Sequence, residues 1–263
     1  MRAHPAKAFP GQGALAVPGW LRRARPLLGT LVDIGVPAGH EEALLAAFGA
    51  IERVQALMSA FDPDSDLGRA HRAPAGQPTR VHRWTAEVLS LAADLHAQTG
   101  GLFDVSQGSG AWAIEPDDGG GVLTRQDEGA RLDLGGIAKG WAVDRALAAA
   151  IAAGAPAAWV NAGGDIGSQG VTVPVALRLE RQGSVRPWVR VRDGAIATSD
   201  FHPEARARLH GPALAWHVSV QAPCCAWADA LTKIVARHGD AGSPACEALL
   251  QRYRARAWIH HGH

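Results

Sequence analysis

The residues best suited to bind an anion lie around a glycine pair in the middle of the chain. Gly135 and Gly136 separate a segment with strand character from one with helical character. Glycines at such a turn let the backbone approach a ligand closely, and the amides at a helix N-terminus point toward an anion such as a pyrophosphate. Lys139 adds a cation to the first helical turn, where it opposes the helix dipole, so an anionic ligand explains it better than helix stability does. Taken alone, the pattern also fits an ordinary strand-to-helix turn with a solvated lysine.

Two further turns carry polar side chains directly after predicted strands. Asn161 is followed by the turn Gly163–Asp165, a pattern that is common in turns without any ligand. Thr198 and Ser199 end another predicted strand, where their hydroxyl groups can bind a phosphate or cap the next element. Neither turn identifies a function by itself.

Asp229 and Lys233 form a candidate pair of opposite charges. They stand four residues apart in a segment with helical periodicity, so their side chains share one face of the helix. An ion pair within the helix is the simplest interpretation.

These residues must be positioned by a mixture of helices and strands, which indicates an α+β fold. Residues 105–130 show no sustained period and are rich in glycine and polar residues, so they are predicted to form a loop. Apolar residues at helical spacing predict helices over His40–Ala60, Thr85–Gln98, Ala138–Ala153, Ala226–His238 and Pro244–Tyr253. Segments rich in β-favouring residues predict strands over Leu31–Val36, Arg131–Leu134, Ala157–Val160, Val171–Glu180, Trp188–Arg192, Ala195–Ala197, His217–Gln221 and Ala255–Ile259.

The composition indicates one globular domain with little net charge. With 263 residues, 47% hydrophobic and 19% charged, the chain can bury a core, and we expect a single domain over residues 26–260. A formal net charge of +1 disfavours nucleic acid as a partner. No run approaches the roughly 20 apolar residues of a transmembrane span. Residues 1–25 are interrupted by proline and glycine, so we expect a flexible tail without an export signal, and a cytoplasmic location.

Seven segments, in one order, resemble the ApbE-type family of FAD:protein FMN transferases. Each segment is weak alone, but their order and spacing are specific, and the Rossmann, P-loop and HExxH zinc motifs do not occur. The resemblance implies an ApbE-like, T-fold-like α+β fold, in which mixed, largely antiparallel sheets are flanked by helices. The segments run from about Pro26 to Ile259 and are RPLLGTLVDI, MSAFDPDSDLGRAH, TGGLFD, LDLGGIAKGWAVD, VNAGGDI, IATS and ADALTK.

The resemblance implies a transferase that acts on FAD. Members of the family cleave the FAD pyrophosphate, attach FMN through a phosphoester to a Thr or Ser of a partner protein, and release AMP. The expected partner is therefore a flavin-accepting protein, such as a redox protein. By resemblance, Phe61 would lie beside the isoalloxazine, where an aromatic ring can stack. The expected FAD-binding residues are Phe61, Ser65, Asp104, Gly135, Gly136, Lys139, Asp144, Gly163, Gly164, Asp165, Thr198 and Ser199.

The segment around Asp229 departs from the family's metal site. Family members typically show Asp-Ala-Leu-x-Thr, whose Asp and Thr bind magnesium together with a backbone carbonyl, here that of Ala138. In this chain Lys233 occupies the position of that threonine, and a threonine stands one residue earlier, at Thr232. A lysine ammonium has no lone pair for a metal. Either Lys233 displaces the metal and supplies the positive charge itself, or the helix shifts and Thr232 binds magnesium with Asp229. We favour the first alternative.

The segment after Thr198 and Ser199 departs further. The family's His-Ile-Ile-Asp-Pro-x-Thr-Gly is absent, and we take His210 as the remnant of its histidine, with His202 and His217 as rivals. The expected catalytic residues are therefore Asp229, Lys233 and His210. These departures leave two other functions open, namely an FAD-binding protein with impaired catalysis and an FAD pyrophosphatase that yields FMN and AMP.

Overall fold

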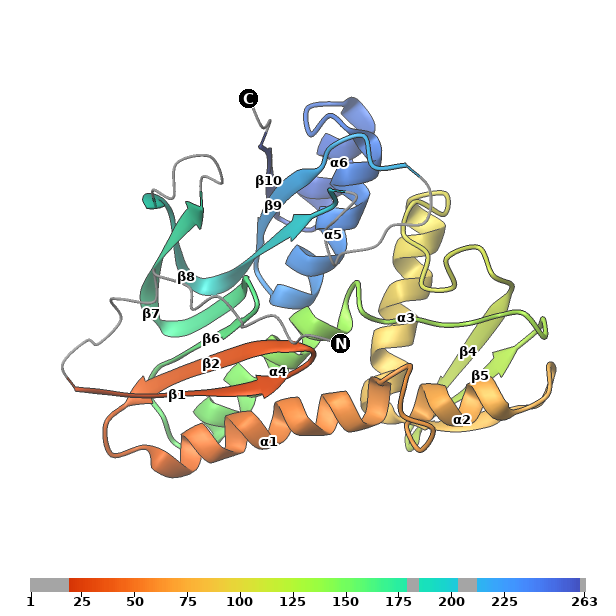
Figure 1. Ribbon diagram of the computed structural model, residues 1–263, viewed down its shortest axis with the longest axis horizontal. Helices are drawn as coiled ribbons and strands as arrows, with labels where there is room; N and C mark the ends of the chain where they lie inside the picture. The colour runs from red at the N-terminus through yellow and green to blue at the C-terminus, as the bar shows by residue number, and fades with distance from the viewer. Residues whose placement is uncertain (1–18, 179–184, 203–211, 261–263) are drawn as a thin grey trace, which may run out of the picture.

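The chain folds into two sheets with helices packed against each of them (Figure 1). The computed structural model describes residues 19–178, 185–202 and 212–260. Within these residues the larger sheet has seven strands in the order β1-β2-β6-β7-β8-β9-β10, and the smaller has three in the order β3-β5-β4. All neighbouring strands are antiparallel, which confirms the predicted α+β class with antiparallel sheets.

The strands are β1 Trp20–Leu27, β2 Thr30–Pro37, β3 Thr79–His82, β4 Trp112–Asp117, β5 Gly120–Arg125, β6 Ala158–Ala162, β7 Asp165–Arg178, β8 Val185–Asp200, β9 His217–Ala222 and β10 Arg256–Ile259. The helices are α1 Glu41–Met58, α2 Asp66–Arg72, α3 Arg83–Gln98, α4 Ala138–Ala152, α5 Cys225–His238 and α6 Pro244–Arg252.

Helices α1, α4 and α5 form a layer on one face of the large sheet. Helix α4 contacts β6 and β7, α5 contacts β8 and β9, and α1 packs on α4 and β2. Their apolar faces are turned toward the sheet, as expected for amphipathic helices. Phe48, Ile51, Val143 and Leu231 are among the side chains that this core buries almost completely.

The N-terminal turn of α4 meets the N-terminal turn of α5 at Gly140. A β-carbon at this position would lie 2.3 Å from the carbonyl oxygen of Cys225. Because only glycine permits so close an approach, Gly140 sets the distance between the two helices. Gly167 on β7 plays a similar part beneath α4, since a β-carbon there would lie 2.8 Å from the side chains of Val143 and Leu147.

The prediction of a loop over residues 105–130 is wrong, because β4 and β5 form a hairpin there. Helix α3 packs on both strands, and β5 also pairs with β3. Arg125 at the end of β5 is buried, and its guanidinium donates to the carbonyls of Ala70, Ala73 and Ala130. The polar composition concealed the hairpin because some of its polar side chains bind the backbone inside the protein.

Residues 20–25, predicted to belong to the tail, form most of the edge strand β1. Arg22 pairs with Asp33 on β2. The Arg25 guanidinium lies 2.9 Å from the Glu52 carboxylate and 4.4 Å from the centroid of the Phe48 ring. The prediction of a tail is wrong for these residues, because Arg22 and Arg25 attach the segment to β2 and α1.

Arg131–Leu134 is predicted to form a strand but has no regular secondary structure. Its amides form separate hydrogen bonds, from Asp133 to the Val105 carbonyl at 2.8 Å and from Leu132 to His71 Nε2 at 2.9 Å. The segment resembles a strand in sequence because Leu132 and Leu134 are both buried.

The remaining predicted elements correspond to observed ones. The strands predicted over Trp188–Arg192 and Ala195–Ala197 are parts of one strand, β8, and residues 179–180 of the strand predicted before them lie outside the described residues. None of the helices in the described ranges is long and apolar enough to cross a membrane.

Candidate active site

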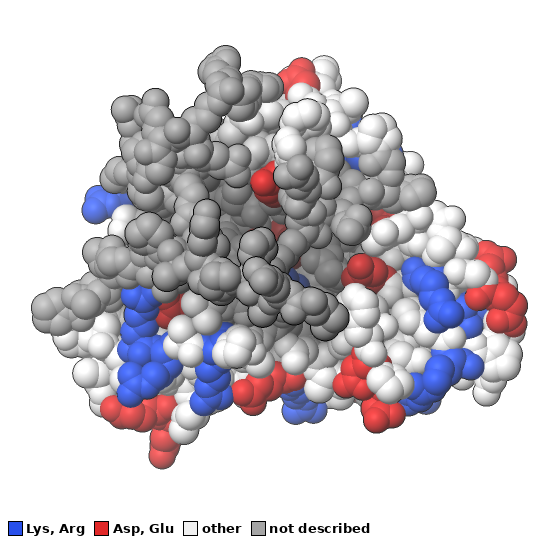
Figure 2. Space-filling model, viewed as in Figure 1, with Lys and Arg blue, Asp and Glu red and all other residues white. Residues whose placement is uncertain are grey.

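No broad region of one charge dominates the visible surface. In Figure 2 basic and acidic side chains alternate over the described part of the face, in keeping with the formal net charge of +1. An anionic ligand would therefore have to be bound by a local arrangement of charges.

Such an arrangement lies where α4, α5 and the β6–β7 turn meet. Lys139 in the first turn of α4 pairs with Asp165, and its Nζ lies 3.9 Å from Asp229 Oδ2. Lys233 pairs with Asp229 through Oδ1 and donates to its carbonyl oxygen at 3.0 Å. We call Lys139, Asp165, Asp229 and Lys233 the ion cluster. It brings together four residues that the sequence analysis assigned to the site.

Burial and mutual charge set the ionisation of the cluster. Both carboxylates are 0% exposed. Burial, followed by the charge of Asp229, raises the pKa of Asp165 to about 7 although Lys139 opposes the shift. Burial also disfavours the charged form of Asp229, but Lys139 and Lys233 outweigh it and hold the pKa of Asp229 below its ordinary value. The two carboxylates likewise outweigh burial and raise the pKa of Lys139.

The first amides of α4 already have an anionic neighbour within the protein. The Gly140 amide donates to Asp229 Oδ2 at 3.2 Å. The helix has no side-chain N-cap hydrogen bond and no acidic residue in its first turn. Asp229 therefore supplies from α5 the negative charge that the N-terminus of α4 favours. Lys139 is the most exposed member of the cluster, with 26% of its side chain exposed against 11% for Lys233.

The two hydroxyls of the Thr198-Ser199 pair point to opposite faces of the sheet, as successive strand residues must. Ser199 Oγ lies 2.8 Å from Thr232 Oγ1 on α5 and accepts from Lys233 at 3.3 Å. Thr198 Oγ1 instead lies 2.8 Å from Ser219 Oγ on the neighbouring strand β9. The structure thus brings Ser199, but not the Thr198 hydroxyl, into contact with the ion cluster.

The glycine turns border the cluster. A β-carbon on Gly136 would lie 3.6 Å from the Lys233 side chain and 3.5 Å from the Phe103 ring. The Gly135 amide donates to Asp133 at 2.8 Å. Gly163 and Gly164 turn the chain between β6 and β7 with φ of +63° and +103°, values that favour glycine.

A pocket of about 40 Å³ opens beside the cluster. Asp104, Gly136 and Lys233, which were predicted, line it together with Phe103, Asp133 and Arg237, which were not. Phe103 directly precedes the predicted Asp104, Asp133 stands two residues before the predicted Gly135, and Arg237 stands one helical turn after Lys233. Helical and turn spacing around the motifs could have identified all three.

Asp144 and Ser65 have structural partners that the sequence did not reveal. Asp144 accepts from the amides of Cys225 at 2.7 Å and Ala226 at 2.9 Å, so its carboxylate caps α5. Burial raises the pKa of Asp144 to about 6 despite these hydrogen bonds. Ser65 is buried and accepts from the Gly68 amide at 2.8 Å as the N-cap of α2.

The other predicted residues lie in varied surroundings. Phe61 is 97% exposed, so its ring is available for stacking. Ala138 begins α4 beside the cluster. His210 lies outside the described residues. Its rivals contact other aromatic rings, His202 with Trp216 at 5.1 Å and His217 with His260 at 5.0 Å between centroids.

The donor set at Asp229 does not fit a hard divalent cation. Each oxygen of the Asp229 carboxylate already has a hydrogen-bond donor. The ammonium group of Lys233 contacts Oδ1, and that of Lys139 lies 3.9 Å from Oδ2. The Thr232 hydroxyl donates to the Asp229 carbonyl at 2.7 Å. A cation at this carboxylate would be repelled by Lys139 and Lys233. In the described parts of the chain, no group of three or more His, Cys, Asp or Glu side chains could hold a metal ion.

Known proteins resemble this chain in sequence and in fold. The model of the ApbE family matches residues 28–118 and 109–202. The FAD:protein FMN transferase of Vibrio cholerae serotype O1 is 28% identical over 183 residues, 57% of this chain. The match spans 55% of that relative, so the chain covers about half its length.

Solved structures support the fold. The flavin transferase ApbE from Vibrio cholerae has a TM-score of 0.74 at 21% identity, covering 91% of this chain and 93% of that one. The apo form of the Pseudomonas stutzeri flavinyl transferase ApbE has a TM-score of 0.74 at 18% identity, covering 92% of each chain. The ApbE protein of Thermotoga maritima has a TM-score of 0.73 at 23% identity, covering 91% and 94%.

Proposed function

The chain belongs to the ApbE family, and from this premise we propose that it is an FAD:protein FMN transferase. In the proposed reaction a Ser or Thr oxygen of a partner protein bonds to the FMN phosphorus of FAD. The pyrophosphate bond to AMP breaks, AMP leaves, and the hydroxyl proton is released. The observation that carries the proposal is the ion cluster at the glycine turns, because it holds two lysines in the segments that define the resemblance, and one of them, Lys233, lines a small pocket.

The two ammonium groups suit a pyrophosphate. An ammonium and a phosphate oxygen about 4 Å apart attract each other by on the order of 4 kcal/mol at an effective dielectric constant of 20, and the paired carboxylates of Asp165 and Asp229 offset part of this attraction. Preformed charges of this kind stabilise the negative charge that develops on phosphate oxygens during phosphoryl transfer. We propose that Lys139, the more exposed of the two, contacts the pyrophosphate directly. Lys233 would attract the pyrophosphate electrostatically from a more buried position.

We further propose that Lys233 replaces a divalent cation in this chain. Its ammonium already neutralises Asp229, and the Thr232 hydroxyl is engaged with Ser199 and the Asp229 carbonyl. Binding of magnesium through Asp229 and Thr232 would require these hydrogen bonds to break. The ion pair between Lys233 and Asp229, four residues apart on α5, supports this replacement.

Titration with Mn²⁺ followed by electron paramagnetic resonance tests this replacement without any turnover. We expect the wild-type chain to leave Mn²⁺ free in solution, and Lys233→Thr, which restores the family's Asp-to-Thr spacing, to bind it. Glu42→Gln, an exposed change on α1, is the matched control. A hard cation found at roughly 2.1 Å from the Asp229 carboxylate in the wild type would overturn the replacement.

The flavin contacts of the proposed complex follow from the placement of the other residues. The exposed Phe61 ring would stack on the isoalloxazine, and Gly136, Gly163 and Gly164 would let the backbone approach the nucleotide. Asp104 would line the same pocket. Asp144 would act on the site indirectly, by holding α5 in place through its cap.

Incubation with FAD and a candidate acceptor protein tests the proposed transfer. Covalently attached, fluorescent FMN on the acceptor together with equimolar AMP is the expected result. Free FMN with AMP would instead identify an FAD pyrophosphatase, and bound but intact FAD would identify a binding protein with impaired catalysis. Lys139→Met should remove transfer whichever acceptor is used.

A further inference from the structure

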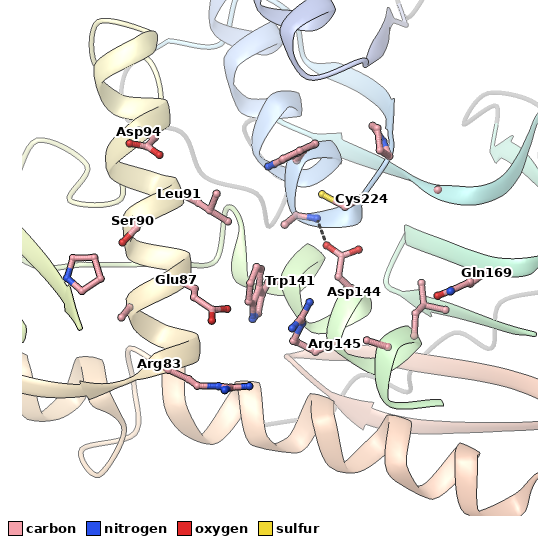
Figure 3. A pocket seen from close by; sticks show the side chains of 18 of the residues that line it. Arg83, Glu87, Ser90, Leu91, Asp94, Trp141, Asp144, Arg145, Gln169 and Cys224 are labelled. Atoms are coloured by element: carbon pink, nitrogen blue, oxygen red, sulfur yellow. Dashed lines mark hydrogen bonds between the residues drawn. The ribbon is translucent and has the colours of Figure 1, made fainter. Parts of the chain in front are cut away.

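A second and larger cavity lies on the other side of α4 from the ion cluster. It is a groove of about 900 Å³ between α3 and the β4–β5 turn on one side and α4 and the start of α5 on the other (Figure 3). No member of the ion cluster lines it. Figure 3 shows Glu87 and Leu91 of α3 directed toward Trp141 of α4. A groove of this size can enclose several residues of an extended peptide or a ligand of similar size.

One wall of the groove is acidic. Helix α3 contributes Glu87 and Asp94, and the β4–β5 turn contributes Asp117 and Asp118. Asp117 pairs with Arg80, whereas Glu87, Asp94 and Asp118 form no salt bridge with any described residue. Arg83 is the basic residue of this wall. The wall therefore attracts a cation and repels a phosphate.

The opposite wall presents indole rings and hydrogen-bond donors that have no acceptor in the described structure. Trp141 and Trp227 line it, and the Arg145 guanidinium carbon lies 4.6 Å from the centroid of the Trp141 ring. Trp141 Nε1 and Arg145 Nε are both buried without a hydrogen-bond partner. Ser90 Oγ, on α3, is a third such atom.

Buried polar atoms without a hydrogen-bond partner are concentrated at the groove. Four buried side-chain nitrogen or oxygen atoms lack a partner in the described structure, and the groove residues Ser90, Trp141 and Arg145 account for three of them. Buried donors are normally satisfied, so their clustering here points to an acceptor that arrives from outside. Backbone carbonyls of a peptide are acceptors of the required kind.

We propose that the groove binds an extended segment of a partner protein that carries Arg or Lys side chains. Because both nitrogens are buried, the side chains of Trp141 and Arg145 turn toward the peptide when its carbonyls accept from Nε1 and Nε. The cationic side chain meets Glu87 and Asp94 and lies against an indole face, which attracts cations. The acidic wall opposes acidic peptides and nucleotides. This inference is independent of flavin transfer, because it uses none of the residues of the ion cluster.

Fluorescence anisotropy with a labelled peptide tests the proposal. The probe is Gly-Ala-Arg-Ala-Arg-Ala-Gly, and its partner probe carries Glu in place of both Arg residues. We expect the Arg probe to bind the full chain at least tenfold more tightly than the Glu probe, and its binding to weaken as salt is added. Equal affinity for the two probes, or no binding of the Arg probe at millimolar protein, would overturn the proposal.

Variants locate the binding in the groove. Glu87→Gln combined with Asp94→Asn should weaken the Arg probe at least tenfold, and Trp141→Phe, which keeps a ring but removes the N–H, at least threefold. Glu42→Gln on α1 is the matched control and should change nothing. Unaltered circular dichroism and FAD binding in each variant show that the fold and the flavin site are intact. Probe affinities in the groove variants equal to the wild type would refute the location.

Discussion

At the scale of single residues, the ion cluster makes Lys139 the side chain on which two buried carboxylates depend. Lys139→Met leaves Asp165 without its partner and Asp229 with Lys233 alone. Removal of one partner from a buried pair costs about 3–5 kcal/mol. We expect the variant to lose about 3 kcal/mol of unfolding free energy in urea titrations.

A second substitution shows whether the lost stability comes from the broken Lys139–Asp165 ion pair or from a general disturbance of the fold. Lys139→Met with Asp165→Asn removes the stranded carboxylate as well, so it should recover at least about 1 kcal/mol relative to the single variant. Arg192→Met breaks an exposed pair with Asp193 and should cost less than about 1 kcal/mol. Additive effects of Lys139→Met and Asp165→Asn would contradict the coupling.

Asp144 gives a pH-dependent prediction. Burial raises its folded pKa from 3.8 to about 6, so the folded state holds the proton at pH values where the unfolded state has lost it. Stability from this group is therefore highest at low pH and falls as the pH rises toward 6. Asp144→Asn has no carboxyl group to titrate. Between about pH 4 and pH 7 the unfolding free energy of the wild type should therefore fall by about 2 kcal/mol more than that of this variant. Parallel stability curves for the two proteins would contradict this assignment.

Residue types and spacing allowed contacts between residues of one motif to be predicted, but not contacts between distant segments. The i, i+4 relation of Asp229 and Lys233 was predictable from helical geometry, and strand alternation could have separated Thr198 from Ser199. The cap formed by Asp144 could not be predicted, because its partners Cys225 and Ala226 lie more than 80 residues along the chain.

At the scale of elements, the contact of α4 with α5 determines where the ion cluster forms. Gly140→Ala would place a β-carbon 2.3 Å from a backbone oxygen of α5, which cannot move without moving that helix. We expect a loss of about 1–3 kcal/mol in unfolding free energy, as for an overpacked core, and weaker FAD binding because Lys139 moves with α4. Thermal unfolding and an FAD titration measure the two effects.

Gly49→Ala is the matched control for that change. Gly49 lies within α1, and a β-carbon there meets nothing within 4 Å. Alanine should therefore stabilise the helix by about 0.5–1 kcal/mol. Similar losses in both variants would show that helical glycines in general, and not the α4–α5 contact, explain the result.

Elements with a strong apolar period were predicted well, and those without one were not. Helices α1 and α4 each bury one apolar face, and α5 is buried on almost every side, so all three sequences carry apolar residues at helical spacing. The β4–β5 hairpin and β1 owe their positions to arginines that bind carbonyls or carboxylates of distant segments, such as Arg125 and Arg22. Such pairings leave no local periodicity to detect.

At the scale of the whole molecule, a net charge of +1 means that a nucleotide is attracted by local lysines and not by a long-range field. FAD should then stabilise the folded chain mainly through its pyrophosphate. At a ligand concentration 100 times the dissociation constant, linkage adds about 2.7 kcal/mol, which corresponds to a rise in Tm of roughly 5–10 °C for a chain of this size. Riboflavin, which has the same ring but no phosphate, should give a much smaller rise in scanning fluorimetry. Lys139→Met should reduce the FAD shift to the riboflavin level, whereas Arg192→Met should leave it unchanged. An equal shift with FAD and riboflavin would place the binding energy in the ring, and the ion cluster would then have no part in holding the nucleotide.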